Sequence, residues 1–181
     1  MARDPGSFDT VARAYGRGRQ RYPDALLAAL AAAPPGPRVL EIGPGTGQAT
    51  AALRPGGVLV TVTTQHLAGG TEAFFREAWP VHARHEPDEP QAAALPSTPV
   101  PTRDEADDDP AFAPAERTMF IDDVPFDAAG YVALLGTYSN VLGLRPEPRA
   151  ALLGEIAALV ERHGGRIVKR SGYELRVARR R

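Results

Sequence analysis

The sequence predicts an α/β fold in which a small sheet is flanked by helices. Short apolar runs rich in β-branched residues alternate with amphipathic segments that have helical spacing. A glycine-rich bend joins one of the apolar runs to a segment that can be helical. Arg38–Ile42 and Val58–Thr64 are typical of buried strands. The fifteen residues between them are enough for a parallel crossover, which needs about a dozen. We therefore expect these two strands to be parallel neighbours.

The second half of the chain predicts further strands. Met119–Ile121 is a short apolar run. Arg166–Lys169 and Tyr173–Ala178 have strand composition, and we interpret them as one bent strand broken at Ser171-Gly172.

Four segments have the apolar spacing of helices. We expect helices that begin at Pro23 and that cover Thr71–Val81, Ala128–Asn140 and Ala150–Arg162. The residues that we expect to be buried on them are Leu26, Leu27, Leu30, Phe74, Phe75, Trp79, Tyr131, Leu134, Leu135, Tyr138, Leu152, Leu153, Ile156, Leu159 and Val160.

Length and composition predict one domain over residues 1–181 and exclude several classes of function. The net charge of −1 gives no general attraction to nucleic acid or to a membrane surface. The chain has no cysteine, so disulfide and thiol chemistry are excluded. No apolar run approaches the roughly 20 residues that span a bilayer, and we expect a cytoplasmic protein. Residues 83–116, rich in proline and acid, are expected to be a linker within the domain.

The bend Gly43–Gly47 follows an apolar run that carries one acid, Glu41, and precedes a segment that can be helical. Glycine lets a backbone lie close to a ligand, and a helix start favours polar or anionic groups. A dinucleotide fingerprint needs its third glycine at Gln48, and a phosphate-binding loop needs a lysine that is missing here. Glu41 with G-x-G-x-G instead resembles motif I of the class I S-adenosylmethionine-dependent methyltransferases. A glycine turn without a ligand is the ordinary alternative.

Segments on both sides of the bend strengthen the resemblance. Phe8–Tyr15 and Arg19–Pro23 resemble the N-terminal lid of a small-molecule methyltransferase subfamily, so residues 1–22 are expected to form a lid segment. Gln20 departs from this pattern, which has proline there. Arg54–Gly57 resembles the turn that enters strand five, and Tyr131–Ser139 with Gly164–Arg180 resembles the C-terminal half.

The middle of the family's fold is missing from this chain. The resemblance implies two further βα units and a fourth strand before Arg54, or well over about 60 residues, yet Leu53 runs directly into Arg54. We infer an internal deletion across a shared Ala-Ala-Leu. The predicted fold is therefore a reduced Rossmann-like methyltransferase sheet, with strands equivalent to one, five, six and seven, flanking helices, and strands two to four missing.

The resemblance implies transfer of a methyl group from S-adenosylmethionine to a small-molecule acceptor. It assigns cofactor contacts to seven residues: Glu41, Gly43, Gly45, Thr46, Gly47, Tyr15 and Arg19. Proximity and alignment can drive methyl transfer without a dedicated base. An acid about 20 residues after the glycine loop would hold the ribose, but no acid lies between Glu41 and Glu72. A hydrogen bond to a charged acceptor contributes about 1.5–3 kcal/mol, so we expect impaired cofactor binding.

Two alternative functions follow from the same residues. A non-catalytic methyltransferase remnant would act as a binding or oligomerisation module, because lost strands expose sheet edges that favour pairing into a homodimer. An NAD-dependent enzyme is the second alternative, which Gln48 and the missing acid disfavour.

A few other residues have a chemical interpretation beside an ordinary one. His66 follows a strand at its carboxyl end, where ligands bind in open α/β sheets. It is the candidate catalytic residue, as a base or as a group that orients a substrate, with a polar loop histidine as the favoured alternative. His82 and His85 have helical metal-ligand spacing, but exposed histidines at a fraying helix end are favoured, and no metal site is predicted. Asp107–Asp109 is interpreted as solvated linker, and Arg179–Arg181 as a frayed terminus.

Overall fold

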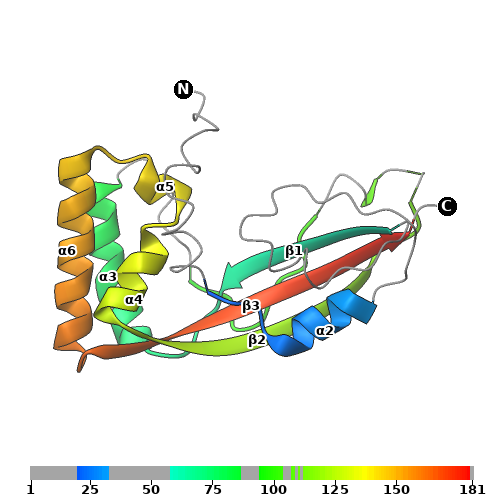
Figure 1. Cartoon of the computed structure of the whole chain (residues 1–181), viewed down its shortest axis with the longest axis horizontal. Helices are drawn as coiled ribbons and strands as arrows, with labels where there is room; N and C mark the ends of the chain where they lie inside the picture. Colours follow the sequence, from blue (N-terminus) through cyan, green and yellow to red (C-terminus); the bar gives the residue numbers. More distant parts are fainter. Residues whose placement is uncertain are drawn as a thin grey trace. The chain divides into compact units, whose positions relative to one another are not determined.

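The structure is a computed structural model that describes residues 20–32, 58–86, 94–103, 107–108, 110 and 112–179. Its helices and strands are drawn in Figure 1. In chain order they are α2 (Asp24–Ala32), β1 (Val58–His66), α3 (Glu72–His85), β2 (Glu116–Asp127), α4 (Ala128–Leu135), α5 (Ser139–Leu142), α6 (Pro146–Arg162) and β3 (Arg166–Arg179).

The chain divides into two compact units. A helical unit comprises Met1–Gln20, Ala68–Leu95 and Asp123–Lys169, and a sheet unit comprises Arg21–Leu67, Pro96–Asp122 and Arg170–Arg181. β2 and β3 each contribute residues to both units.

The helical unit is built on α6, which packs against both α3 and α4 (Figure 1). The predicted apolar stripe of α6 is confirmed, since Leu152, Ile156, Leu159 and Val160 are buried. The helix begins four residues earlier than predicted, because Pro146 occupies its first turn, where a missing N–H costs no hydrogen bond. After Arg162 the chain turns through Gly164 and Gly165, whose φ angles are +86° and +74°, values that favour glycine.

Aromatic rings fill the centre of the helical unit. Phe74 is fully buried and meets Phe75, Tyr131 and His163 edge to face, with ring centroids 5.1, 5.4 and 5.7 Å away. Edge-to-face contacts add to the free energy gained by burying the rings. Trp79 was expected in this core but is only half-buried.

Two helix predictions need correction. The segment Ala128–Asn140 is not one helix: α4 ends at Leu135, and α5 starts at Ser139. The hydroxyl of Thr137 donates to the carbonyl of Leu134 over 2.6 Å, so a side chain occupies a carbonyl that a continuing helix would use. Helix α3 runs four residues beyond the predicted Val81 and contains Pro80.

The sheet has three strands in the order β1-β3-β2 and is antiparallel. Strand β1 pairs with β3 from Val58↔Arg179 to His66↔Ser171. The strand predicted at Val58–Thr64 is thus confirmed, and Met119–Ile121 lies within the longer β2. Strand Arg38–Ile42, its parallel pairing with β1, and the lid segment fall outside the described residues.

Strand β3 is continuous through Gly172, where a break was expected. A Cβ at Gly172 would lie 2.8 Å from Pro99 Cγ and 2.9 Å from Leu67 Cδ1. The glycine therefore serves close packing against neighbouring side chains, which is why it does not interrupt the strand.

Gly154 offers a direct stability prediction. It lies on the exposed side of α6, and a Cβ added there would meet nothing within 4 Å. Gly154→Ala should raise the free energy of unfolding by about 0.5–1 kcal/mol, because alanine loses less backbone entropy in a helix. Urea denaturation followed by circular dichroism measures this, with Gly164→Ala, at a positive φ, as the control that should destabilise.

Candidate functional site

The cofactor residues that the sequence predicts are not among those the structure describes. Glu41, Gly43, Gly45, Thr46, Gly47, Tyr15 and Arg19 all lie in the ranges 1–19 and 33–57. Only His66 is described: it is the last residue of β1, opposite Ser171 of β3, and is half-buried. It is therefore part of a strand and not a loop histidine.

A buried carboxylate that the sequence analysis did not single out organises the sheet unit. The side chain of Glu174 on β3 is fully buried. Its Oε2 accepts hydrogen bonds from the Thr102 amide at 2.8 Å, the Thr102 hydroxyl at 2.6 Å and the Thr63 hydroxyl at 3.3 Å. Its Oε1 accepts from Arg117 Nη1 at 2.5 Å. One carboxylate thus links β1, β2, β3 and the loop before β2.

The surroundings of Glu174 determine its charge. Burial raises the pKa of Glu174, but the hydrogen bonds from Thr102 and the contact with Arg117 outweigh burial and hold this pKa below its usual value. The same contact raises the pKa of Arg117. A carboxylate that is kept ionised and whose two oxygens are both engaged is a poor general base. Its role in this geometry is to hold the loop.

We call residues Pro99–Thr102 the strap. The side-chain amide of Gln65 donates to the carbonyl of Val100 over 2.5 Å and accepts from its N–H over 2.9 Å. Thr102 is held by Glu174, and its carbonyl accepts from Arg117 at 2.7 Å. Since prolines 99 and 101 have no N–H, both amide donors of the strap bind side chains of the sheet unit. This part of the predicted linker is therefore fastened to the sheet.

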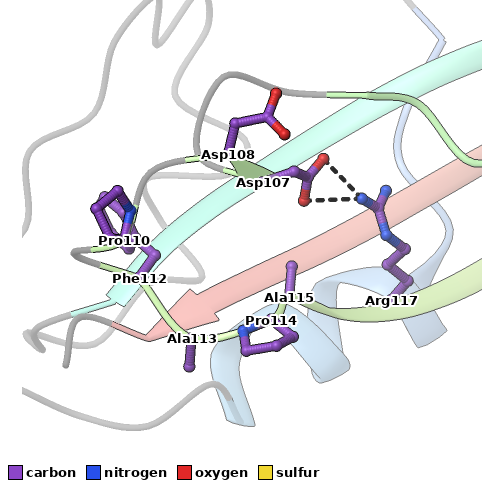
Figure 2. Close-up of a pocket in the computed structure, with 8 residues that line it drawn as sticks. All are labelled: Asp107, Asp108, Pro110, Phe112, Ala113, Pro114, Ala115 and Arg117. Carbon is purple, nitrogen blue, oxygen red and sulfur yellow. Dashed lines mark hydrogen bonds and ion pairs between the residues drawn. The ribbon is translucent and has the colours of Figure 1, made fainter.

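Asp107 extends the network toward a second arginine. Its carboxylate contacts Arg117 Nη2 at 2.9 and 3.0 Å, as Figure 2 shows, and Arg176 Nη2 at 2.7 Å. The interpretation of Asp107 as solvated linker was therefore wrong. A pocket of about 360 Å³ lies beside these groups, and Phe112 also lines it. Asp107 and Arg117 already satisfy each other there, so they offer a ligand no uncompensated charge.

The histidines of α3 are also paired with carboxylates. His82 Nδ1 lies 2.5 Å from Oε2 of the buried Glu86, whose Oε1 accepts from Asn140 at 2.6 Å. His85 Nε2 lies 2.8 Å from Glu155, which also pairs with Arg84. The expectation of exposed histidines on a fraying helix end was wrong, because both belong to an ordered α3. Within the described residues, no group of three or more potential ligands could hold a metal ion.

The sequence contained a signal for the Glu174 network. Glu174 and Arg176 are two residues apart in the otherwise apolar segment Tyr173–Ala178, which places both on one face of the strand. Charged residues buried in this way need partners, and their presence predicts a polar network. Those partners, from Thr63 to Arg117, are distant in sequence and have no recognisable spacing.

A helix long and apolar enough to cross a membrane is not found in the part of the chain that the structure describes. The chain matches no protein-family model and no curated protein.

Proposed function

We propose that the chain is an internally shortened class I methyltransferase that uses S-adenosylmethionine to methylate a small molecule. One observation carries the proposal: strand β3, which follows β1 and β2 in the chain, lies antiparallel between them. The resemblance equates β1 and β2 with strands five and six of the class I fold, and in that fold strand seven is likewise inserted antiparallel between them. The motif resemblance before β1 indicates strand five independently of this order, so two separate lines of support agree.

Under this proposal the cofactor contacts are those that the resemblance assigns. Gly43, Gly45 and Gly47 would admit the methionine part, and Glu41 would order the loop or bind the amino group. Tyr15 and Arg19 would cap the site. The missing ribose acid weakens binding by about tenfold or more, so we expect affinity below that of intact enzymes.

His66 is the one candidate catalytic residue that the structure describes. It is the last residue of β1. Under the proposal β1 is the equivalent of strand five, and ligands bind at the carboxyl ends of the parallel strands in such folds. Gln65, its neighbour, binds the strap through both atoms of its amide. We propose His66 for orienting an acceptor because of this position at the end of β1.

Ligand-induced stabilisation tests the proposal. A ligand at ten times its Kd should stabilise the folded protein by about 1.4 kcal/mol, which corresponds to a rise in Tm of roughly 3–6 °C for a chain of this size. We expect millimolar S-adenosylhomocysteine to give this shift in differential scanning fluorimetry. Isothermal titration with S-adenosylmethionine should give a Kd weaker than micromolar.

Two glycine variants provide the matched comparison. Gly45→Val should abolish the shift, because a branched side chain fills the bend, whereas Gly154→Ala, on the exposed face of α6, should retain it. No shift with wild-type protein at millimolar ligand would contradict the proposal. A shift with NAD⁺ but not with S-adenosylhomocysteine would favour the dinucleotide alternative instead.

A further inference from the structure

Among the residues that the structure describes, strand β1 is an edge strand that lacks the usual protection against pairing. It lies at one end of the order β1-β3-β2 (Figure 1), and no second neighbour of it is found among the described residues. Its nine residues, Val58–His66, include no lysine, arginine, aspartate, glutamate or proline. Its apolar side chains are only half-buried. Natural edge strands are normally interrupted by charges, prolines or bulges.

The opposite edge shows the contrast. Strand β2 carries Arg117, Asp122, Asp123 and Pro125 among its residues, the features that discourage a further strand from adding. The two edges of one sheet therefore differ, and only β1 is composed like a strand with neighbours on both sides.

We propose that β1 pairs with β1 of a second copy of this chain, antiparallel and centred on Val62. With a two-fold axis at Val62, Val62 lies opposite the partner's Val62, and Val60 lies opposite the partner's Thr64. Because β1 has no formally charged residue other than a titratable histidine, this self-pairing sets no like charges opposite each other. The product is a continuous six-stranded sheet with the protected β2 at both ends. This inference is independent of cofactor binding, but it replaces the parallel pairing of Arg38–Ile42 with β1 that the sequence predicts.

A second copy is a better occupant of this edge than the chain's own Arg38–Ile42. That segment offers five residues and two charges, Arg38 and Glu41, and would pair in parallel after the short connection to β1. A second β1 offers nine residues and an antiparallel ladder, which is the more stable arrangement per residue. A closed two-fold dimer is also the commonest arrangement among soluble homo-oligomers.

Molar mass in solution tests the proposal with a pair of matched lysine variants. Val62→Lys sets two like charges opposite each other at the axis and should raise the dimer Kd by roughly 100-fold. Ile121→Lys changes an exposed side chain on the other edge strand and should leave it unchanged. In light scattering after size exclusion, wild type and Ile121→Lys should have twice the chain mass of 19.3 kDa, and Val62→Lys that of one chain. Circular dichroism confirms that each variant is folded.

Cross-linking provides the second measurement, on a chain that contains no cysteine. Opposed residues of an antiparallel pair have Cα atoms about 4.5–5.5 Å apart, within the range that a disulfide bridges. Mild oxidation should therefore convert Val62→Cys to a covalent dimer at least tenfold faster than Ile121→Cys. A monomeric wild type, a dimer that survives Val62→Lys, or an intrachain bridge in Leu40→Cys/Val62→Cys would overturn the proposal.

Discussion

Phe74→Ala is expected to lower the free energy of unfolding by about 3–5 kcal/mol, the range for a buried phenylalanine truncated to alanine. Phe74 is fully buried, and its ring meets three other aromatic rings within 5.7 Å. The variant leaves a cavity that the helices close only in part and removes every edge-to-face contact of the ring. Because natural domains have about 5–15 kcal/mol of stability in total, the change is large enough to unfold part of the population.

Urea denaturation measures this loss, and the chain's only tryptophan, Trp79 on α3, reports on the helical unit by its fluorescence. Phe126→Ala is the matched control, since Phe126 packs against the same cluster but is only partly buried. Phe126→Ala should lower the free energy of unfolding by clearly less than Phe74→Ala. Equal effects of the two variants would show that the cluster does not centre on Phe74.

Glu174→Ala is expected to lower the free energy of unfolding by about 3 kcal/mol. Removing one partner of a buried ion pair costs about 3–5 kcal/mol, and the effect falls at the lower end because Arg117 is partly exposed and keeps its contact with Asp107. The amide and hydroxyl of Thr102 also lose their acceptor. Proteolysis within residues 94–103 should become faster, because the strap loses its hydrogen bonds to Glu174 and keeps only those to Gln65 and Arg117.

Glu155→Ala is the matched control for Glu174→Ala. Glu155 also pairs with an arginine, Arg84, but its side chain is 42 % exposed. Exposed ion pairs contribute about 0–1 kcal/mol, so this variant should be close to wild type in urea denaturation. Comparable losses from both variants would contradict the role assigned to Glu174.

The Glu174 network also makes stability depend on pH in a defined direction. The pKa of Glu174 is lower in the folded protein than its usual value, so the folded state binds fewer protons on this group than the unfolded state does. The resulting stabilisation is complete above the unfolded pKa, about 4.3 for glutamate, and is lost as the pH falls through the folded pKa. Urea midpoints measured between pH 2.5 and 7 should fall less steeply below pH 5 for Glu174→Gln than for wild type.

Local patterns in the sequence predicted most of the described elements. The apolar spacing of α6 and the β-branched run of β1 identify their own element types, because each pattern is complete within a few turns or residues. The failures have a different origin. Gly172 has the composition of a break, but contacts with Pro99 and Leu67 decide its role, and such contacts between distant residues leave no local pattern.

The candidate site likewise has one part that a local sequence pattern predicts and one part that no local pattern predicts. The glycine bend Gly43–Gly47 is recognisable from a few consecutive residues, whereas the Glu174 network joins residues from Thr63 to Arg176. Only the spacing of Glu174 and Arg176 indicated a buried polar face. The residues that neutralise that face are set by the path of the loop before β2 across the sheet unit. No short segment of the sequence determines this path.

The amide of Gln65 contacts only main-chain atoms of Val100, and this sets which substitutions evolution can accept there. The side chain of Val100 is exposed, so position 100 is free to vary among residues that keep an N–H, and only proline is barred. The side chain at position 65, in contrast, must carry a hydrogen-bond donor and an acceptor at the same distance from the main chain. Glutamine meets this condition and glutamate does not. Among relatives of this chain, variation should therefore accumulate at residue 100 while glutamine persists at residue 65.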